Sequence, residues 1–137
     1  MELSSSHIGM LTYLQNTTRP DISMAAHQAA RFCIEPKLSH ERAVKRIGRY
    51  LSGNKNKGLI FRPQDEIVLE SFADADFAGL WGVEDSQDPT CVKSRTGYLI
   101  RLGNVPVVWK SKLQTLIALS TMEAEYVSLS MCMRELI

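Results

Sequence analysis

The sequence is poor in cysteine and has no long apolar run. Its three cysteines, Cys33, Cys91 and Cys132, are scattered through 137 residues without a CxxC pair. Such a set argues against a disulfide framework or a zinc site and is typical of a reducing compartment. No stretch approaches the roughly 18 apolar residues of a membrane span. The first residues, MELSSSHIG, lack the apolar core of a signal peptide. We expect an intracellular protein that is not secreted and has no membrane partner.

The chain also lacks a net charge that would indicate a partner. Its 16 Lys and Arg nearly balance 15 Asp and Glu, for a net charge of +1. These charges are nevertheless segregated, because residues 31–57 are mostly basic among their charged positions and residues 64–88 contain acids but no Lys or Arg. The segregation indicates two functional surfaces. A Gly-rich phosphate loop is absent from the sequence, which argues against a P-loop nucleotide hydrolase.

Helical spacing dominates the first part of the chain. Apolar residues from Ile8 to Leu14 predict one helix. The Thr18-x-x-Asp21 pair with Pro20 predicts that a second helix starts there, with side-chain oxygens capping free amides. A third helix is predicted from Ser39 to Gly53. Its expected buried side is Ala43, Val44, Ile47, Tyr50 and Leu51.

After residue 57, the spacing of apolar residues changes from that of helices to that of β-strands. Residues 58–61, 67–73, 96–102 and 105–109 are β-prone, and Gly103-Asn104 predicts a hairpin between the last two. Residues 62–65 read as a turn, and residues 115–119 as a further strand. A final helix is predicted from Ser120. Its expected buried stripe is Met122, Tyr126, Leu129, Met133 and Leu136. The chain is therefore predicted to be α/β.

Asp74 and Asp76 lie where an apolar strand gives way to a loop. Residues two apart on a strand share a face, and carboxylates at a strand end are natural ligands for Mg²⁺. The alternative is a turn that happens to use aspartates.

Glu123 and Glu125 lie near the predicted start of the final helix. Ser120-x-x-Glu123 is a capping box, which gives Glu123 a sufficient structural role. Glu125 is expected at the edge of the buried stripe, roughly 60° from Met122. A metal ion there would offset the cost of burying its charge. The alternative is a partly exposed acid that the helix dipole stabilises.

One side of the third predicted helix is basic. Arg42, Lys45, Arg46 and Arg49 are candidates for contacts with a nucleic-acid backbone, although an ordinary solvated helix face has the same pattern. Arg95 belongs to a second positive patch near the hairpin.

Six segments occur in a recognisable order. They are NTTRPDI at 16–22, HERAVKRIGRYL at 40–51, DADFAG at 74–79, SRTGY at 94–98, WKSKLQ at 109–114 and ALSTMEAEYV at 118–127. In this order and spacing the chain resembles the Pol polyproteins of copia-type LTR retrotransposons. The resemblance divides it into a helical connection segment after the reverse transcriptase, residues 1–57, and the N-terminal part of a ribonuclease H-like domain, residues 58–137.

The resemblance implies a truncated ribonuclease H-like fold, with a three-stranded antiparallel meander and a helix preceded by the helical segment. It implies that Asp74 and Glu125 are catalytic ligands of two Mg²⁺ (or Mn²⁺) ions, and that Asp76 and Glu123 shape the site. The implied reaction is hydrolysis of RNA in an RNA–DNA hybrid, and the implied partner is the parent's reverse transcriptase domain. Later acidic positions of the family are missing, so we expect this chain to be inactive alone. The alternatives are a non-catalytic nucleic-acid-binding module or a relic without a selected function.

Overall fold

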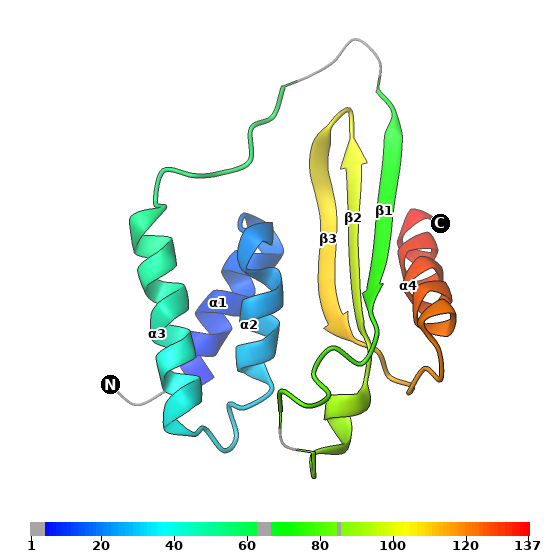
Figure 1. The fold of residues 1–137 in the computed structure, drawn as a ribbon. Helices are drawn as coiled ribbons and strands as arrows, with labels where there is room; N and C mark the ends of the chain where they lie inside the picture. Colours follow the sequence, from blue (N-terminus) through cyan, green and yellow to red (C-terminus); the bar gives the residue numbers. More distant parts are fainter. Residues whose placement is uncertain (1–4, 63–66, 85) are drawn as a thin grey trace. The chain divides into compact units, whose positions relative to one another are not determined.

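The computed structural model describes residues 5–62, 67–84 and 86–137 (Figure 1). Its elements follow the order α1 (Ser5–Thr17), a 3₁₀ turn (Pro20–Ile22), α2 (Ser23–Ala30), α3 (Leu38–Gly53), β1 (Leu69–Asp76), a second 3₁₀ turn (Pro89–Val92), β2 (Arg95–Leu102), β3 (Val105–Leu113) and α4 (Thr121–Leu136). The chain divides into two compact units, Met1–Ile60 and Phe61–Ile137. Each has its own core. The predicted α/β class is confirmed.

The N-terminal unit is a group of three helices around a small apolar core. Its buried members are Ile8, Leu11, Ile22, Ala26, Ala29 and Ile47. On α3, Ile47 is buried as predicted and Val44 and Leu51 pack against the core, whereas Ala43 and Tyr50 are exposed. The wide polar face of α3 leaves only a narrow stripe of this helix in the core.

The capping predicted for the start of the second helix is wrong. No side chain caps the 3₁₀ turn or α2, and the Asp21 carboxylate instead binds the Arg19 guanidinium through two hydrogen bonds of 2.9 and 2.7 Å. Pro20 still begins the turn, because its missing amide needs no partner there.

The C-terminal unit contains one three-stranded antiparallel sheet in the order β1-β2-β3. The predicted hairpin is confirmed: Gly103 and Asn104 join β2 to β3 with φ values of +53° and +68°. Both residues tolerate these left-handed angles better than others. β1 pairs with β2 along its whole length, with Asp74 opposite Gly97.

Two predicted strands are absent from the sheet. Residues 58–61 and 115–119 are described, and neither segment forms a strand. The predicted turn at 62–65 falls largely outside the described residues. Over the described ranges, no helix combines the length and apolarity needed to cross a membrane.

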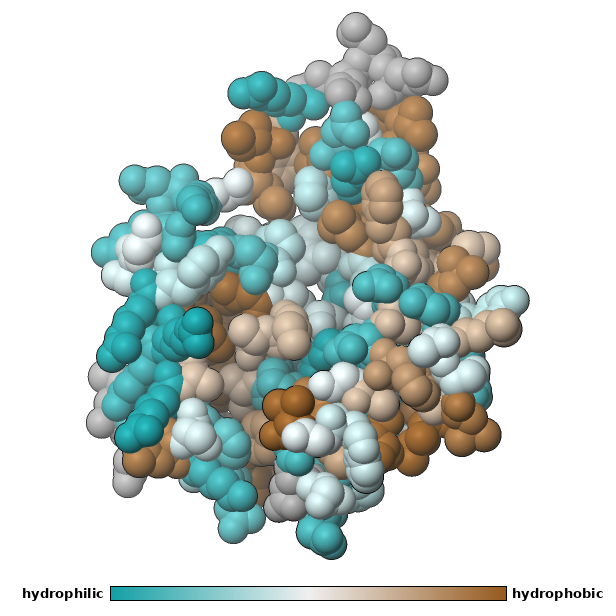
Figure 2. All heavy atoms as spheres, in the orientation of Figure 1, coloured by the Kyte–Doolittle hydropathy of each residue, from teal (hydrophilic) through white to brown (hydrophobic). Residues whose placement is uncertain are grey.

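α4 packs on the sheet with a different face from the one predicted (Figure 1). Its buried residues are the small ones, Ala124, Ser128 and Cys132. Of the predicted stripe, only Leu136 packs against the core of this unit, as expected. The other four residues are exposed, with 68% of Met122 and 65% of Tyr126 accessible. Tyr98 and Ile100 of β2 already fill the space over the sheet, so small helix residues fit against them. Figure 2 shows hydrophobic side chains, in brown, at the surface on the side where Figure 1 draws α4.

Candidate functional site

Asp74 and Asp76 lie on one face of β1, as predicted from their spacing. Ala73 packs against the cluster of Tyr98, Ile100 and Cys132, so it faces α4. Side chains alternate along a strand, which places the Asp74 and Asp76 carboxylates on the opposite face of the sheet. Both aspartates are exposed.

Asp76 lies against the backbone of the loop that follows β1. A Cβ atom added to Gly79 would overlap all three terminal atoms of the Asp76 carboxyl group. Glycine at this position therefore lets the carboxylate fold back over the loop. The loop is also held by Ser94, a fully buried residue whose hydroxyl accepts a 3.3 Å hydrogen bond from the Ala78 amide. These contacts give Asp76 a position within the loop, while its predicted role in shaping a metal site stays a prediction.

A buried serine attaches α4 to the sheet beside Asp74. The Ser128 hydroxyl donates a 2.6 Å hydrogen bond to the Asp74 carbonyl oxygen, and the residue is fully buried. Glu125 lies almost one turn earlier on the same helix. Ser128 is not among the residues predicted from the sequence, although its spacing of four from Ala124 and from Cys132 is a usable signal.

A buried glutamine makes a second attachment near the start of α4. Gln114 Nε2 donates to Thr96 Oγ1 at 3.1 Å and to the Ala124 carbonyl oxygen at 2.9 Å. Its own Oε1 atom is buried and has no hydrogen-bond partner among the described residues. This residue was also missed, because the sequence contains no local sign of a contact between β2 and α4 through residue 114.

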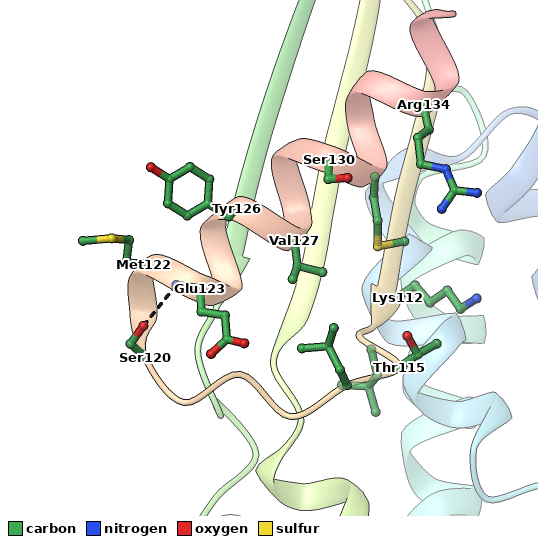
Figure 3. Close-up of a pocket in the computed structure, with 12 residues that line it drawn as sticks. Lys112, Thr115, Ser120, Met122, Glu123, Tyr126, Val127, Ser130 and Arg134 are labelled. Atoms are coloured by element: carbon green, nitrogen blue, oxygen red, sulfur yellow. Dashed lines mark hydrogen bonds between the residues drawn. The ribbon is translucent and has the colours of Figure 1, made fainter.

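The start of α4 is capped much as the sequence predicts. The Ser120 hydroxyl accepts a 3.1 Å hydrogen bond from the Glu123 amide (Figure 3). The Glu123 carboxylate reaches back one residue further than expected, because Oε2 accepts a 2.7 Å bond from the Leu119 amide rather than from Ser120. Glu123 thus satisfies a free backbone donor ahead of the helix.

The two predicted metal ligands lie on opposite layers of the C-terminal unit. Glu125 is exposed on α4, and Asp74 is exposed on the far face of β1. β1 is an edge strand of the sheet, so a shared ion would have to sit around this edge. In the described part of the chain, no three His, Cys, Asp or Glu side chains gather where they could hold a metal ion. Two Mg²⁺ ions need more carboxylates than these two. The described residues do not fit a complete two-ion site.

The basic face of α3 is exposed at Arg42, Lys45, Arg46 and Arg49. Lys45 forms a 2.6 Å ion pair with Glu41, one turn earlier on the helix. Among the described residues, no ion pair involves Arg46 or Arg49. Arg42 likewise forms no ion pair with the described residues, so three of the four cations are available to an external anion.

Arg95 does not belong to an exposed patch. Only 6% of the residue is accessible, and its guanidinium lies 3.4 Å from the Ser111 hydroxyl on β3. A buried guanidinium is not presented to a phosphate backbone, so we leave Arg95 out of the nucleic-acid surface.

Comparison with known proteins identifies the relatives of this chain. It is 41% identical over 133 residues to "Retrovirus-related Pol polyprotein from transposon TNT 1-94" of Nicotiana tabacum, and 39% identical over 123 residues to the Pol polyprotein from transposon RE1 of Arabidopsis thaliana. These alignments cover 97% and 90% of the chain but 9% and 8% of the relatives. The chain thus spans less than a tenth of their length.

A third relative has nearly the same extent as the chain. "Secreted RxLR effector protein 161" of Plasmopara viticola is 36% identical over 130 residues, which cover 95% of the chain and 86% of that protein. No family model and no solved structure matches the chain. The alignments with the transposon Pol polyproteins confirm the predicted family: the chain belongs to the copia-type retrotransposon Pol polyproteins and spans one short segment of those relatives.

Proposed function

We propose that this chain is the segment of a retrotransposon Pol polyprotein that supplies the first catalytic strand and the acidic helix of a ribonuclease H-like domain. The observation that carries the proposal is the 2.6 Å hydrogen bond from Ser128 to the Asp74 carbonyl oxygen. It fixes the helix that bears Glu125 against the strand that bears Asp74. The Pol names of the relatives support the polyprotein context.

The reaction of the proposed domain is hydrolysis of RNA in an RNA–DNA hybrid, and the polyprotein's reverse transcriptase domain would be its partner. Asp74 and Glu125 would each donate carboxylate oxygens to Mg²⁺ or Mn²⁺. They are too few to position two ions, so the chain alone should not cleave. Further acids from a longer polyprotein segment would have to complete the site.

Cleavage of a labelled hybrid in Mg²⁺ tests this proposal. The 137-residue chain should be inactive, and a longer Pol segment with the same sequence should be active. In the longer segment, Asp74→Asn and Glu125→Gln should each abolish cleavage, while Glu35→Gln, at an exposed acid of the N-terminal unit, should not. Cleavage by the short chain, or an active Asp74→Asn variant of the long one, would overturn the assignment.

Nucleic-acid binding by α3 is a second candidate function, favoured by Arg46 and Arg49, which are exposed and form no ion pair with any described residue. Phosphate contacts release counterions, so affinity should fall steeply with salt. Replacing Arg46 with Ala should weaken hybrid binding and reduce the salt slope by about one. Lys55→Ala is a matched control, because Lys55 is exposed beyond α3. Affinity that does not change with salt would exclude this function.

We propose an intracellular location, as for a polyprotein that acts in reverse transcription. One relative is named a secreted effector, so the location needs its own test. Fractionation of cells that express the tagged chain should recover it in the cell pellet. Recovery from the medium would contradict this location.

A further inference from the structure

α4 carries an apolar stripe that the C-terminal unit leaves uncovered. This outer stripe consists of Met122, Tyr126, Leu129 and Met133, of which 68%, 65%, 49% and 49% are accessible. Met122 and Tyr126 stand at the rim of the groove beside α4, and Figure 3 shows their side chains pointing to the other side of the helix from Val127 and Arg134. The spacing of four, three and four is that of a coiled-coil seam. The stripe is therefore shaped to receive another helix.

The flank of α4 next to the outer stripe has an ordered charge pattern. Glu123, Val127, Ser130 and Arg134 follow with the same spacing, one residue further along, and all line the groove between α4 and the end of β3 (Figure 3). The acid lies in the first turn and the base in the last. Between them the flank is uncharged. Only Oε2 of Glu123 binds the Leu119 amide, so Oε1 is left for a cation.

We propose that two copies of this chain associate through α4 in antiparallel orientation about a two-fold axis. That axis places Met122 opposite Met133 of the second copy, and Tyr126 opposite its Leu129. Glu123 then meets Arg134 of the second copy at both ends of the contact.

The positions of Glu123 and Arg134 at opposite ends of α4 favour a second copy of the chain as the partner, in antiparallel orientation. A parallel pair would set Glu123 against Glu123 and Arg134 against Arg134, and like charges in contact oppose association. The antiparallel pair gives two attractive contacts, and it also opposes the two helix dipoles. A second copy of the chain therefore has the arrangement of acid, apolar residues and base that complements α4 in antiparallel orientation.

The contact is small. A helix of 16 residues is about 24 Å long, so two such helices bury an area at the low end for specific interfaces. The dimer should therefore be in reversible, concentration-dependent equilibrium with the monomer, with a dissociation constant in the micromolar range.

Analytical ultracentrifugation of the full chain over a range of concentrations tests the association. The wild-type chain should shift from monomer to dimer, and Tyr126→Lys should remain monomeric. Val107→Lys is the matched control: Val107 is an exposed apolar residue of β3, and this variant should dimerise normally. Circular dichroism melting shows whether each variant is folded, and Leu129→Lys repeats the test at a second position of the stripe.

Charge reversal tests the direction of the pair. Arg134→Glu and Glu123→Lys should each weaken dimerisation by at least about tenfold, and the double variant should restore it. The Glu123→Lys variant and the double variant both lose the Glu123 cap, so a tighter dimer in the double variant reports the pairing itself. A wild-type chain that stays monomeric to about 1 mM would overturn the proposal. So would a dimer that survives Tyr126→Lys, or a double variant that stays monomeric. Capture of the stripe by a longer Pol segment while the chain alone stays monomeric would assign it to that segment instead.

Discussion

Arg19 and Asp21 bind each other through two parallel hydrogen bonds across Pro20. The Nε and Nη2 atoms of Arg19 donate to the two carboxylate oxygens of Asp21 at 2.9 and 2.7 Å. From the end of α3, the Tyr50 hydroxyl donates to Asp21 at 2.8 Å, and the Asn54 carbonyl accepts from Arg19 at 3.3 Å. The pair therefore joins the start of α2 to the end of α3, which gives the NTTRPDI segment a structural role.

Removing the guanidinium should destabilise the N-terminal unit. Arg19 is largely buried, and Arg19→Met keeps its apolar stem but leaves the Asp21 carboxylate without its cation. Asp21 is partly exposed to water, so we expect a moderate loss of about 1–2 kcal/mol. Urea denaturation followed by the helical circular dichroism signal measures it. Arg46→Met, on the exposed face of α3, should leave the midpoint unchanged; equal midpoints for both variants would contradict this role.

Acid should weaken the same contact. The Arg19 guanidinium is the main cause that lowers the pKa of Asp21 from 3.8 to about 2. A lowered folded-state pKa contributes stability that is present above pH 3.8 and lost as the pH falls toward 2. Asp21→Asn should lack this part of the acid sensitivity. The difference between the wild-type and Asp21→Asn melting temperatures should therefore shrink between about pH 4 and pH 2. A difference that is constant over this window would argue against the pair.

High pH should destabilise the C-terminal unit because the Tyr98 hydroxyl ionises. Burial is the main cause that raises its pKa to about 12, aided by the 3.0 Å hydrogen bond that its hydroxyl donates to Glu135. Because the folded pKa is raised, its contribution is present below pH 10 and is lost as the pH rises toward 12. In thermal melts between pH 9 and 12, Tyr98→Phe should lose less stability than the wild-type chain. Parallel pH profiles for the two proteins would show that ionisation of Tyr98 does not matter.

The attachment of α4 to β1 should depend on one hydroxyl. Ser128→Ala removes the hydrogen bond to the Asp74 carbonyl with little change in volume, and should cost about 1 kcal/mol. Ser130→Ala is the matched control, because Ser130 is exposed on the same helix. Hydrogen exchange of β1 amides should increase only in Ser128→Ala. Equal exchange in both variants would assign the attachment of α4 to packing alone.

Local signals account for the parts of the fold that the sequence predicts well. Gly103-Asn104 can be read without tertiary information because both residues accept positive φ, and the hairpin they predict is present. The sharing of a face by Asp74 and Asp76 follows from strand alternation alone. Residues 58–61 show the limit of such signals. Their β-prone composition is not enough, because a strand forms only where a neighbouring strand is available to pair with it.

The errors at α4 and Arg95 have a common physical origin. Large apolar residues predict a buried stripe only if the facing surface has room for them, and over β2 it has room for Ala124 and Ser128 instead. The burial of Arg95 likewise depends on what surrounds it, including Ser111 of the neighbouring strand. Gln114 was missed for the same reason, since both of its partners are distant in sequence. A sequence pattern describes a single helix or strand, whereas the burial and contacts of these residues depend on the neighbouring helix or strand as well.

The scattered cysteines make the two units separately observable. Cys33 is partly accessible in the N-terminal unit, while Cys91 and Cys132 are shielded inside the C-terminal one. A thiol reagent should therefore modify Cys33 in the native chain, and reach the other two only when the sheet and α4 open. The labelling rates of Cys91 and Cys132 would time the opening of the C-terminal unit, with Cys33 as an internal reference in the same sample and without any introduced probe.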